Sequence, residues 1–305
     1  MGWQYAYNDG MPDLFRHIAA CNNAVIPGAR LPFSLDGVAV GWVLPDLADA
    51  LLALGANPAA GGVDMSPARL DAAVRALSDT GRFRWRDEAF DVRADPDGPP
   101  LAQVDRGALP ALGIAAEGVH LNGLVERPDG PWMWLGRRAA DKLLDPGKLD
   151  HIVGGGVSAG LTPSETLVKE AGEEAAIPPA LAAAAHPVAT LSYTMERPEG
   201  LRRDRLHCYD LPLPEDFVPY PRDGEVETFE LWPLPRVIER VRDTDDFKFN
   251  VNLVLIDLGL RRGLIAGSEA RQLRTALDRG SAALRPVQPP KATGAVTQQG
   301  PSDRR

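Results

Sequence analysis

Three glutamates at positions 170, 173 and 174 stand close together in the run KEAGEE. On an α-helix with about 100° per residue, Glu173 and Glu174 lie roughly 60° and 40° to either side of Glu170, so the carboxylates share one stripe. Like charges at this spacing repel each other. A hard divalent cation would offset the repulsion, because it takes oxygen ligands and keeps waters that a phosphate can displace. The alternative is a solvated acidic helix face, the usual role of a charge cluster.

The residues before the glutamates predict where their helix begins. Thr162 at the N-cap, Pro163 at the first helical position and Glu165 at the third form a capping box. Ahead of them, a run of three glycines that starts at Gly154 predicts a tight turn between a strand and this helix. Gly154 and Gly155 can also offer a backbone carbonyl to a metal ion. By themselves, three consecutive glycines indicate only the turn.

The segment 155–177 resembles the Nudix box, whose core reads R-E-U-x-E-E, where U is a bulky apolar residue. Glu170, Glu173 and Glu174 take the places of its metal-binding glutamates, and Lys169 takes that of its arginine. The resemblance implies an α/β fold, an α/β/α sandwich around a mixed sheet. It also implies Mg²⁺, with Mn²⁺ as the alternative, and hydrolysis of a diphosphate bond. Glu174 is implied as a catalytic residue as well as a metal ligand.

Three positions depart from the box. Leu161 stands where the box has its first glutamate, Lys169 replaces the arginine, and Ala176 replaces a glycine. Lys169 keeps the charge but loses the planar fork of arginine. These departures leave open a non-catalytic module that keeps the fold and binds a ligand. Retention of all three glutamates favours catalysis, because a pure binder has no need of a self-repelling stripe.

Further runs are similar to the Nudix branch with an N-terminal accessory domain, an arrangement that some relatives fuse to thiamine diphosphokinase. These runs are Gly37–Pro45, Arg137–Lys142, Pro146–Asp150, Asp223–Glu227 and Phe247–Asn250. The branch implies that thiamine diphosphate or its oxidised analogues are hydrolysed to the monophosphate and phosphate. The alternative within the fold is a pyrophosphatase that acts on a different nucleoside diphosphate derivative.

Basic residues after a predicted hairpin are candidates for binding the substrate. Arg137, Arg138 and Lys142 can hold phosphate oxygens through charge-assisted hydrogen bonds. Basic residues in such a place more often serve surface solvation. We therefore treat the three as alternatives for a single phosphate contact.

Acidic residues and histidines outside the box extend the predicted site. Glu225 and Glu227 follow a turn where the family often has a further metal ligand or base, and we favour Glu225 as catalytic. Their alternation also fits the solvent face of an edge strand. His151 can shuttle a proton or be a half-exposed polar residue, and His120 is interpreted as a packed residue.

Composition narrows the class of partner. The 305 residues include 33 Lys and Arg against 42 Asp and Glu, a net charge of −9, which disfavours nucleic acid and anionic membranes as partners. Cys21 and Cys208 lack the spacing of a disulfide framework or a zinc site.

The first residues lack a signal-peptide pattern, and the apolar run Val251–Leu260 is too short to span a bilayer. We expect a cytoplasmic protein whose partner is a small-molecule diphosphate, and the oligomeric state stays open.

Composition shifts along the chain predict four parts. Residues 1–115 form a smaller α+β accessory domain, 116–265 the Nudix domain, 266–284 a C-terminal helix, and 285–305 a proline-rich disordered tail. The predicted elements of the first part are a helix near 11–21, strands at 31–33, 38–43 and 83–92, helices after Pro45 and Ser66, and a loop at 93–107. Those of the second part are a hairpin at 118–136, strands at 188–195, 205–211 and 226–231, and a helix that Asn250 caps.

Overall fold

A seven-stranded mixed sheet positions the acidic helix. The computed structural model describes residues 14–282, so the predicted tail lies outside the described residues. The strand order is β11-β12-β7-β8-β13, with β10 paired to β7 and β9 paired to β8. Strands β12 and β7 run parallel, and the other neighbours run antiparallel. The strands are β7 Ala115–Arg127, β8 Gly130–Arg138, β9 Leu149–His151, β10 Val153–Gly156, β11 His186–Arg197, β12 Gly200–Pro212 and β13 Val226–Pro233.

Two long hairpins make up most of this sheet, and both turn at a proline, an acidic residue and a glycine. The predicted hairpin at 118–136 is confirmed as β7 and β8, which turn at Gly130 with a φ of 118°. Strands β11 and β12 turn in the same way at Gly200, where φ is 129°. Glycine is required at both positions because side chains disfavour positive φ. The predicted strands at 188–195, 205–211 and 226–231 are confirmed within β11, β12 and β13.

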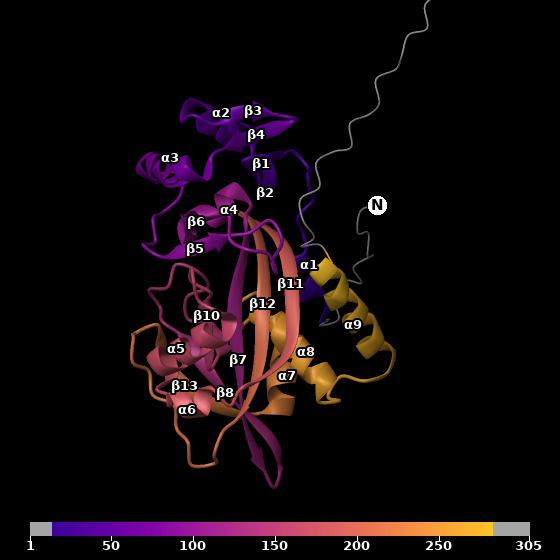
Figure 1. Ribbon diagram of the computed structural model, residues 1–305. Helices are drawn as coiled ribbons and strands as arrows, with labels where there is room; N and C mark the ends of the chain where they lie inside the picture. The colour runs from indigo at the N-terminus through magenta and orange to yellow at the C-terminus, as the bar shows by residue number, and fades with distance from the viewer. Residues whose placement is uncertain (1–13, 283–305) are drawn as a thin grey trace, which may run out of the picture.

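Helices cover both faces of the sheet (Figure 1). Helices α5 (Pro163–Ala175) and α6 (Pro179–Ala182) lie on one face. The other face carries α7 (Leu234–Asp243), α8 (Val251–Arg261) and α9 (Gly267–Ala282). The apolar side chains of the sheet strands divide between the two helical layers. Val119 and Leu121 of β7 pack with α5, whereas Leu124 packs with the α8 layer. The predicted α/β/α sandwich with a mixed sheet is confirmed.

A smaller α+β part precedes the sheet, as predicted. Its four-stranded sheet has the order β2-β1-β4-β3, and a two-stranded sheet joins β5 to β6. Its own core is formed by buried side chains from these strands and from helices α2 and α3. The elements are β1 Leu31–Leu35, β2 Val38–Val43, α2 Pro45–Ala53, β3 Asn57–Ala59, β4 Gly62–Met65, α3 Pro67–Asp79, β5 Ala89–Val92, β6 Ala102–Asp105, a 3-10 turn η1 Arg106–Ala108 and α4 Leu109–Leu112.

The predicted loop at 93–107 contains a strand. Strand β6 pairs with β5 and buries Val104, while the carboxylate of Asp105 accepts hydrogen bonds from the backbone N–H groups of Arg86 and Glu88. Glycine, proline and aspartate in the run ADPDGPP mark only the turn of this hairpin. The predicted strand at 83–92 is correspondingly shorter, since β5 begins at Ala89.

Helix α1 (Phe15–Cys21) departs from the predicted division of the chain. Leu14, Ile18 and Cys21 join the core formed by α7, α8, α9 and β11, not the core of the α+β part. His17 Nε2 lies 2.7 Å from the carbonyl oxygen of Val241 at the end of α7. Helix α1 lies beside α9 and β11 (Figure 1) and also contacts α8, so its apolar side chains join the core of that layer.

Helix α8 forms the centre of the second layer. The predicted helix is present, but the predicted cap is wrong, because Asn250 has helical backbone angles and its side chain makes no capping hydrogen bond. Every residue from Val251 to Gly259 is buried. Asp257 is 1% exposed and forms ion pairs with Arg261 and Arg274, which neutralise its charge inside the core. Within residues 14–282, no helix has both the length and the apolar character needed to cross a membrane.

The capping box of α5 gives a stability prediction. Thr162→Ala should lower the free energy of unfolding by about 1 kcal/mol, because its Oγ1 accepts the Glu165 N–H at 3.2 Å and alanine cannot. Urea denaturation measures the change. Thr275→Ala is the control, since Thr275 is exposed and only donates back to the carbonyl of Arg271. Equal stability of Thr162→Ala and the wild type would contradict the capping role.

Candidate active site

The start of α5 fixes the rotational register of the acidic residues. The predicted capping box is present, since Thr162 N–H also donates to Glu165 at 2.9 Å, and Pro163 is the first helical residue. This register turns Leu167 and Ala171 into the core against the sheet. The glutamates therefore lie on the flank of the helix.

Glu174 is the acidic residue most firmly held. Its side chain is buried, with 6% of the residue exposed, and its Oε2 accepts the N–H of Gly154 at 2.8 Å. Burial raises the pKa of Glu174 well above its usual value, and the charges of Asp150, Glu170 and Glu225 act in the same direction. A bound cation would favour the ionised carboxylate here.

Three carboxylates converge at this point. Ligand oxygens of Glu174, Asp223 and Glu225 all lie within 4.8 Å of one another. Asp223 also accepts the backbone N–H of Glu225 at 2.8 Å, which orders the turn before β13. The Lys142 ammonium contacts Glu225. Oxygen donors alone suit a hard cation such as Mg²⁺ or Mn²⁺, so these residues fit the metal that the sequence implied.

Glu170 and Glu173 are placed differently from Glu174. The carboxylate of Glu170 lies against Gly155, where a Cβ would come within 2.6 Å of it. Glu173 has 51% of its side chain exposed and pairs with Lys169 at 2.7 Å. Lys169 also pairs with Glu170 at 3.0 Å. Neither belongs to the converging group, so their role as metal ligands stays a prediction.

The glycine run forms a strand and not the predicted turn. Residues 153–156 are strand β10, antiparallel to β7. Glycine is required at two positions because a Cβ at Gly155 would strike Glu170, and one at Gly156 would lie 2.5 Å from Phe90. The N–H of Gly154 is the group that contacts Glu174. Its carbonyl as a metal ligand stays a prediction.

The three predicted phosphate-binding residues separate in the structure. Arg137 pairs with Glu230 and donates to the carbonyl of Gly147. Side chains alternate along β8, so Arg137 points to the α7 side while Arg138 points to the α5 side.

Arg138 is held by the carbonyls of Leu144 and Asp145 and by the carboxylate of Asp150. Of the three, Lys142 is the one that contacts the converging carboxylates, through Glu225. Glu227 accepts the backbone N–H of Ala140 instead.

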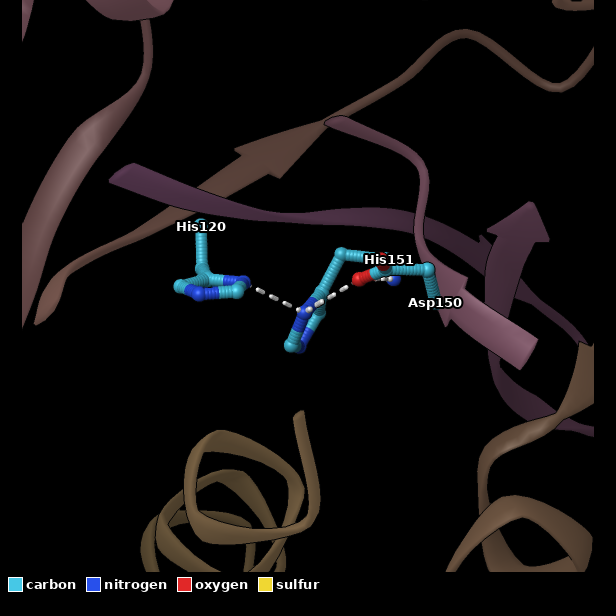
Figure 2. A group of neighbouring side chains, drawn as sticks. All are labelled: His120, Asp150 and His151. Carbon is cyan, nitrogen blue, oxygen red and sulfur yellow. Dashed lines mark hydrogen bonds and ion pairs between the residues drawn. The ribbon is translucent and has the colours of Figure 1, made fainter. Parts of the chain in front are cut away.

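A buried pair of histidines lies beneath Gly154. Figure 2 shows the His151 ring between His120 and Asp150. The two Nδ1 atoms are 3.0 Å apart, so one ring donates and the other accepts. His151 is buried and not half-exposed, while His120 is packed as expected. Burial lowers the pKa of His151 to about 4 and that of His120 well below 6.5. Both rings are therefore neutral at pH 7.

The histidine pair is a poor metal site although its donors cluster. Ligand atoms of His120, Asp150 and His151 lie within 4.8 Å of one another. Arg138 and Lys248 already pair with Asp150, at 2.8 and 3.3 Å. A further cation would meet two positive charges. The cluster lies directly beside Gly154, where a Cβ would be at ordinary contact distance, 3.4 Å, from His120 Nδ1.

Two features of the site do not follow from the sequence: the place of Asp223 beside Glu174, and the contact between His120 and His151. Asp223 was interpreted as part of a turn, and its spacing of two residues from Glu225 was the available signal. His120 and His151 lie on β7 and β9, which do not pair directly, so no spacing along the chain predicts their contact.

The neutral histidines predict a pH dependence of stability. An unfolded histidine titrates near 6.5, so the unfolded chain binds more protons than the folded chain as the pH falls from 7 to 5. With a folded pKa of about 4, His151 should therefore lower the free energy of unfolding by about 2 kcal/mol over this range.

Urea denaturation at pH 7 and pH 5 tests this in the wild type and in His151→Asn, which should show a smaller fall. His186→Asn is the control because His186 is exposed. An identical fall in wild type and His151→Asn would contradict the assignment.

Comparison with known proteins agrees with this geometry. Residues 118–251 match the NUDIX domain family. The chain is 43% identical over 193 residues to Nudix hydrolase 20, chloroplastic, of Arabidopsis thaliana, covering 63% of this chain and 52% of that protein. It is also 43% identical over 180 residues to Nudix hydrolase 24, chloroplastic, of the same plant, covering 59% and 49%. The chain thus spans about half the length of the curated relatives it matches.

Among solved structures, DR0079 of Deinococcus radiodurans is similar at 22% identity and a TM-score of 0.44, covering 55% of this chain and 97% of that one. The matched residues 118–251 include the capped acidic helix, strand β10 and the turn that carries Asp223 and Glu225. Residues 118–251 of this chain form a Nudix domain.

Proposed function

We propose that this chain is a metal-dependent hydrolase that cleaves a diphosphate bond. The observation that carries the proposal is the convergence of Glu174, from the Nudix helix, with Asp223 and Glu225, from the turn before β13. Oxygen donors from two elements that are distant in sequence meet beside a lysine, which is the arrangement that a metal-bound diphosphate needs. The names of the two plant relatives, both called Nudix hydrolases, support the same activity.

The pKa values of two glutamates in this group shift in opposite directions. Burial and neighbouring carboxylates raise the pKa of Glu174, so this residue can accept a proton from an attacking water. Burial also acts to raise the pKa of Glu225, but the bond to Lys142 and nearby arginines outweigh it and lower the pKa. Glu225 therefore stays anionic. We assign Glu174 as the base and Glu225 as a ligand that is ionised throughout.

The rest of the site positions these groups. The Gly154 N–H fixes the Glu174 carboxylate, and Lys142 can exchange Glu225 for a phosphate oxygen. Bound Mg²⁺ would neutralise the diphosphate and lower the pKa of the attacking water. The products would be the monophosphate and phosphate.

We infer thiamine diphosphate and its oxidised analogues as the substrate class. The support is the similarity of five sequence runs to the Nudix branch with an N-terminal accessory domain, together with the α+β part that the chain carries ahead of the sheet. Phosphate release with Mg²⁺ across thiamine, nucleoside and sugar diphosphates tests this. The highest kcat/KM should fall on a thiamine-type diphosphate. Preference for a nucleoside diphosphate derivative would overturn the substrate, and no turnover on any diphosphate would favour a binding module.

Glu174→Gln should separate the catalytic carboxylate from its structural role. Glutamine can still accept the Gly154 N–H, so the fold should persist. We expect kcat to fall by about a hundredfold or more, because the charge that the reaction uses is gone. The Mg²⁺-dependent rise in melting temperature should vanish as well. Melting in chelator should not decrease, since burial disfavours the ionised form.

Glu173→Gln is the matched control, with the same substitution on the same helix at an exposed position. Its kcat should fall less than about tenfold, the loss expected for an exposed charge pair. An equal loss in both variants would place Glu173 among the metal ligands. Unchanged kcat in Glu174→Gln would overturn the proposed site.

Lys142→Met should raise KM or lower kcat/KM by about tenfold or more, as loss of one charge-assisted hydrogen bond to phosphate does. Arg137→Met is the comparison, since Arg137 points to the opposite face and pairs with Glu230. It should leave kcat/KM within about threefold of wild type, the scale of a surface ion pair. Steady-state kinetics measure both. A larger effect at Arg137 would reverse the assignment.

A further inference from the structure

A cavity separate from the carboxylate group lies where the β5–β6 hairpin meets the large sheet. Its volume is about 270 Å³, and its walls come from the hairpin, the segment before α5, and strands β7 and β12. Apolar walls are provided by Phe90, Val157, Leu161 and Pro163. Figure 1 shows the hairpin above the end of the sheet, on the side of α5. The space suits a small organic molecule with an apolar body.

Arg203 of β12 lines this cavity and is 4% exposed. Among residues 14–282, its one side-chain hydrogen bond runs from Nη1 to the carbonyl of Gly113 at 3.1 Å. Its Nε is buried without a partner in the described part of the chain. Burial alone lowers the pKa of Arg203 to about 10, with no contribution from a nearby carboxylate, so the group is charged at pH 7. A buried charge without a counter-ion is costly.

The other charged residues of the cavity already have partners. Arg93 pairs with Asp91 at 2.7 Å, and Arg205 pairs with Asp97 at 2.7 Å. His207 contacts Glu117 at 2.5 Å. Arg203 therefore differs from its neighbours in lacking an acid. Because Nη1 of Arg203 donates to Gly113, the Nε and Nη2 side of the guanidinium remains available to a ligand. These two donors match the two oxygens of a carboxylate or phosphate.

We propose that this cavity binds an organic anion, whose carboxylate or phosphate monoester group pairs with Arg203 and whose apolar body contacts Phe90, Val157 and Leu161. The lining of the cavity includes none of Glu174, Asp223 and Glu225, and anion binding there does not depend on the proposed hydrolysis. Its walls come from both parts of the chain, so a bound anion would also join the α+β part to the large sheet.

The test uses the full chain in excess chelator, so that an anion held by a metal at Glu174 does not contribute. Benzoate, phenyl phosphate and the neutral benzamide are titrated and followed by ligand-detected NMR. At least one of the two anions should bind about tenfold or more tightly than benzamide, the effect of a charge-assisted pair. The tighter of benzoate and phenyl phosphate identifies the head group. Equal binding of benzamide and both anions would overturn the proposal.

Substitutions locate the binding. Arg203→Met should weaken anion binding by about tenfold or more. Arg205→Met is the matched control, because Arg205 lies on the same strand and in the same cavity but is neutralised by Asp97. Its affinity should stay within about threefold of wild type. Retained affinity in Arg203→Met, or an equal loss in Arg205→Met, would overturn the proposal.

A second variant keeps the test decisive if Arg203→Met does not fold. Leu161→Trp fills the cavity from the segment before α5 and leaves Arg203 in place. It should abolish binding of both anions while circular dichroism stays unchanged. Anion binding that survives in folded Leu161→Trp would show that the anions bind elsewhere and would overturn the proposal.

Discussion

The hydrogen bond from Gly154 N–H to the Glu174 carboxylate connects the acidic helix to the sheet. Glu174 is near the C-terminal end of α5, whereas the capping box holds the N-terminal end, so the helix is fixed at both ends. Strand β10 can approach α5 this closely because three of its four residues, Gly154, Gly155 and Gly156, lack side chains. The site therefore depends on a backbone donor and on a short strand of glycines as much as on the acids themselves.

The charges near Glu174 form two groups. Glu174, Asp223 and Glu225 converge in one, and in the other Arg138 and Lys248 pair with Asp150. These two cations outweigh the burial of Asp150 and lower its pKa, so it stays ionised. The neutral histidines His120 and His151 fill the space between without adding charge. The charge of Asp150 is thus balanced by Arg138 and Lys248 and needs no divalent cation.

Sequence signals within a few residues of each other predicted many helices and turns. The pairing of strands that are distant in sequence did not follow from such signals. The capping box at Thr162, the hairpin turn at Gly130 and the helix after Asn250 each depend on neighbours within a few residues, and all three are confirmed. The closeness of Glu174 to Asp223, whose ligand atoms lie within 4.8 Å, depends on how β8 pairs with β13, and that pairing has no local sequence signal. Strand β6 was also missed by the sequence prediction, because the residues around it are mostly turn formers.

Helix α1 changes how the chain can be divided. Because α1 packs beside α8, α9 and β11, the core of the large sheet includes a helix that comes before the α+β part in the chain. Glu196 N–H donates to Asn23 at 2.7 Å, which joins the segment after α1 to β11. Cutting the chain near residue 115 would therefore remove part of the core of the unit that carries the site. A circular permutant that links α9 to α1 would keep that core whole.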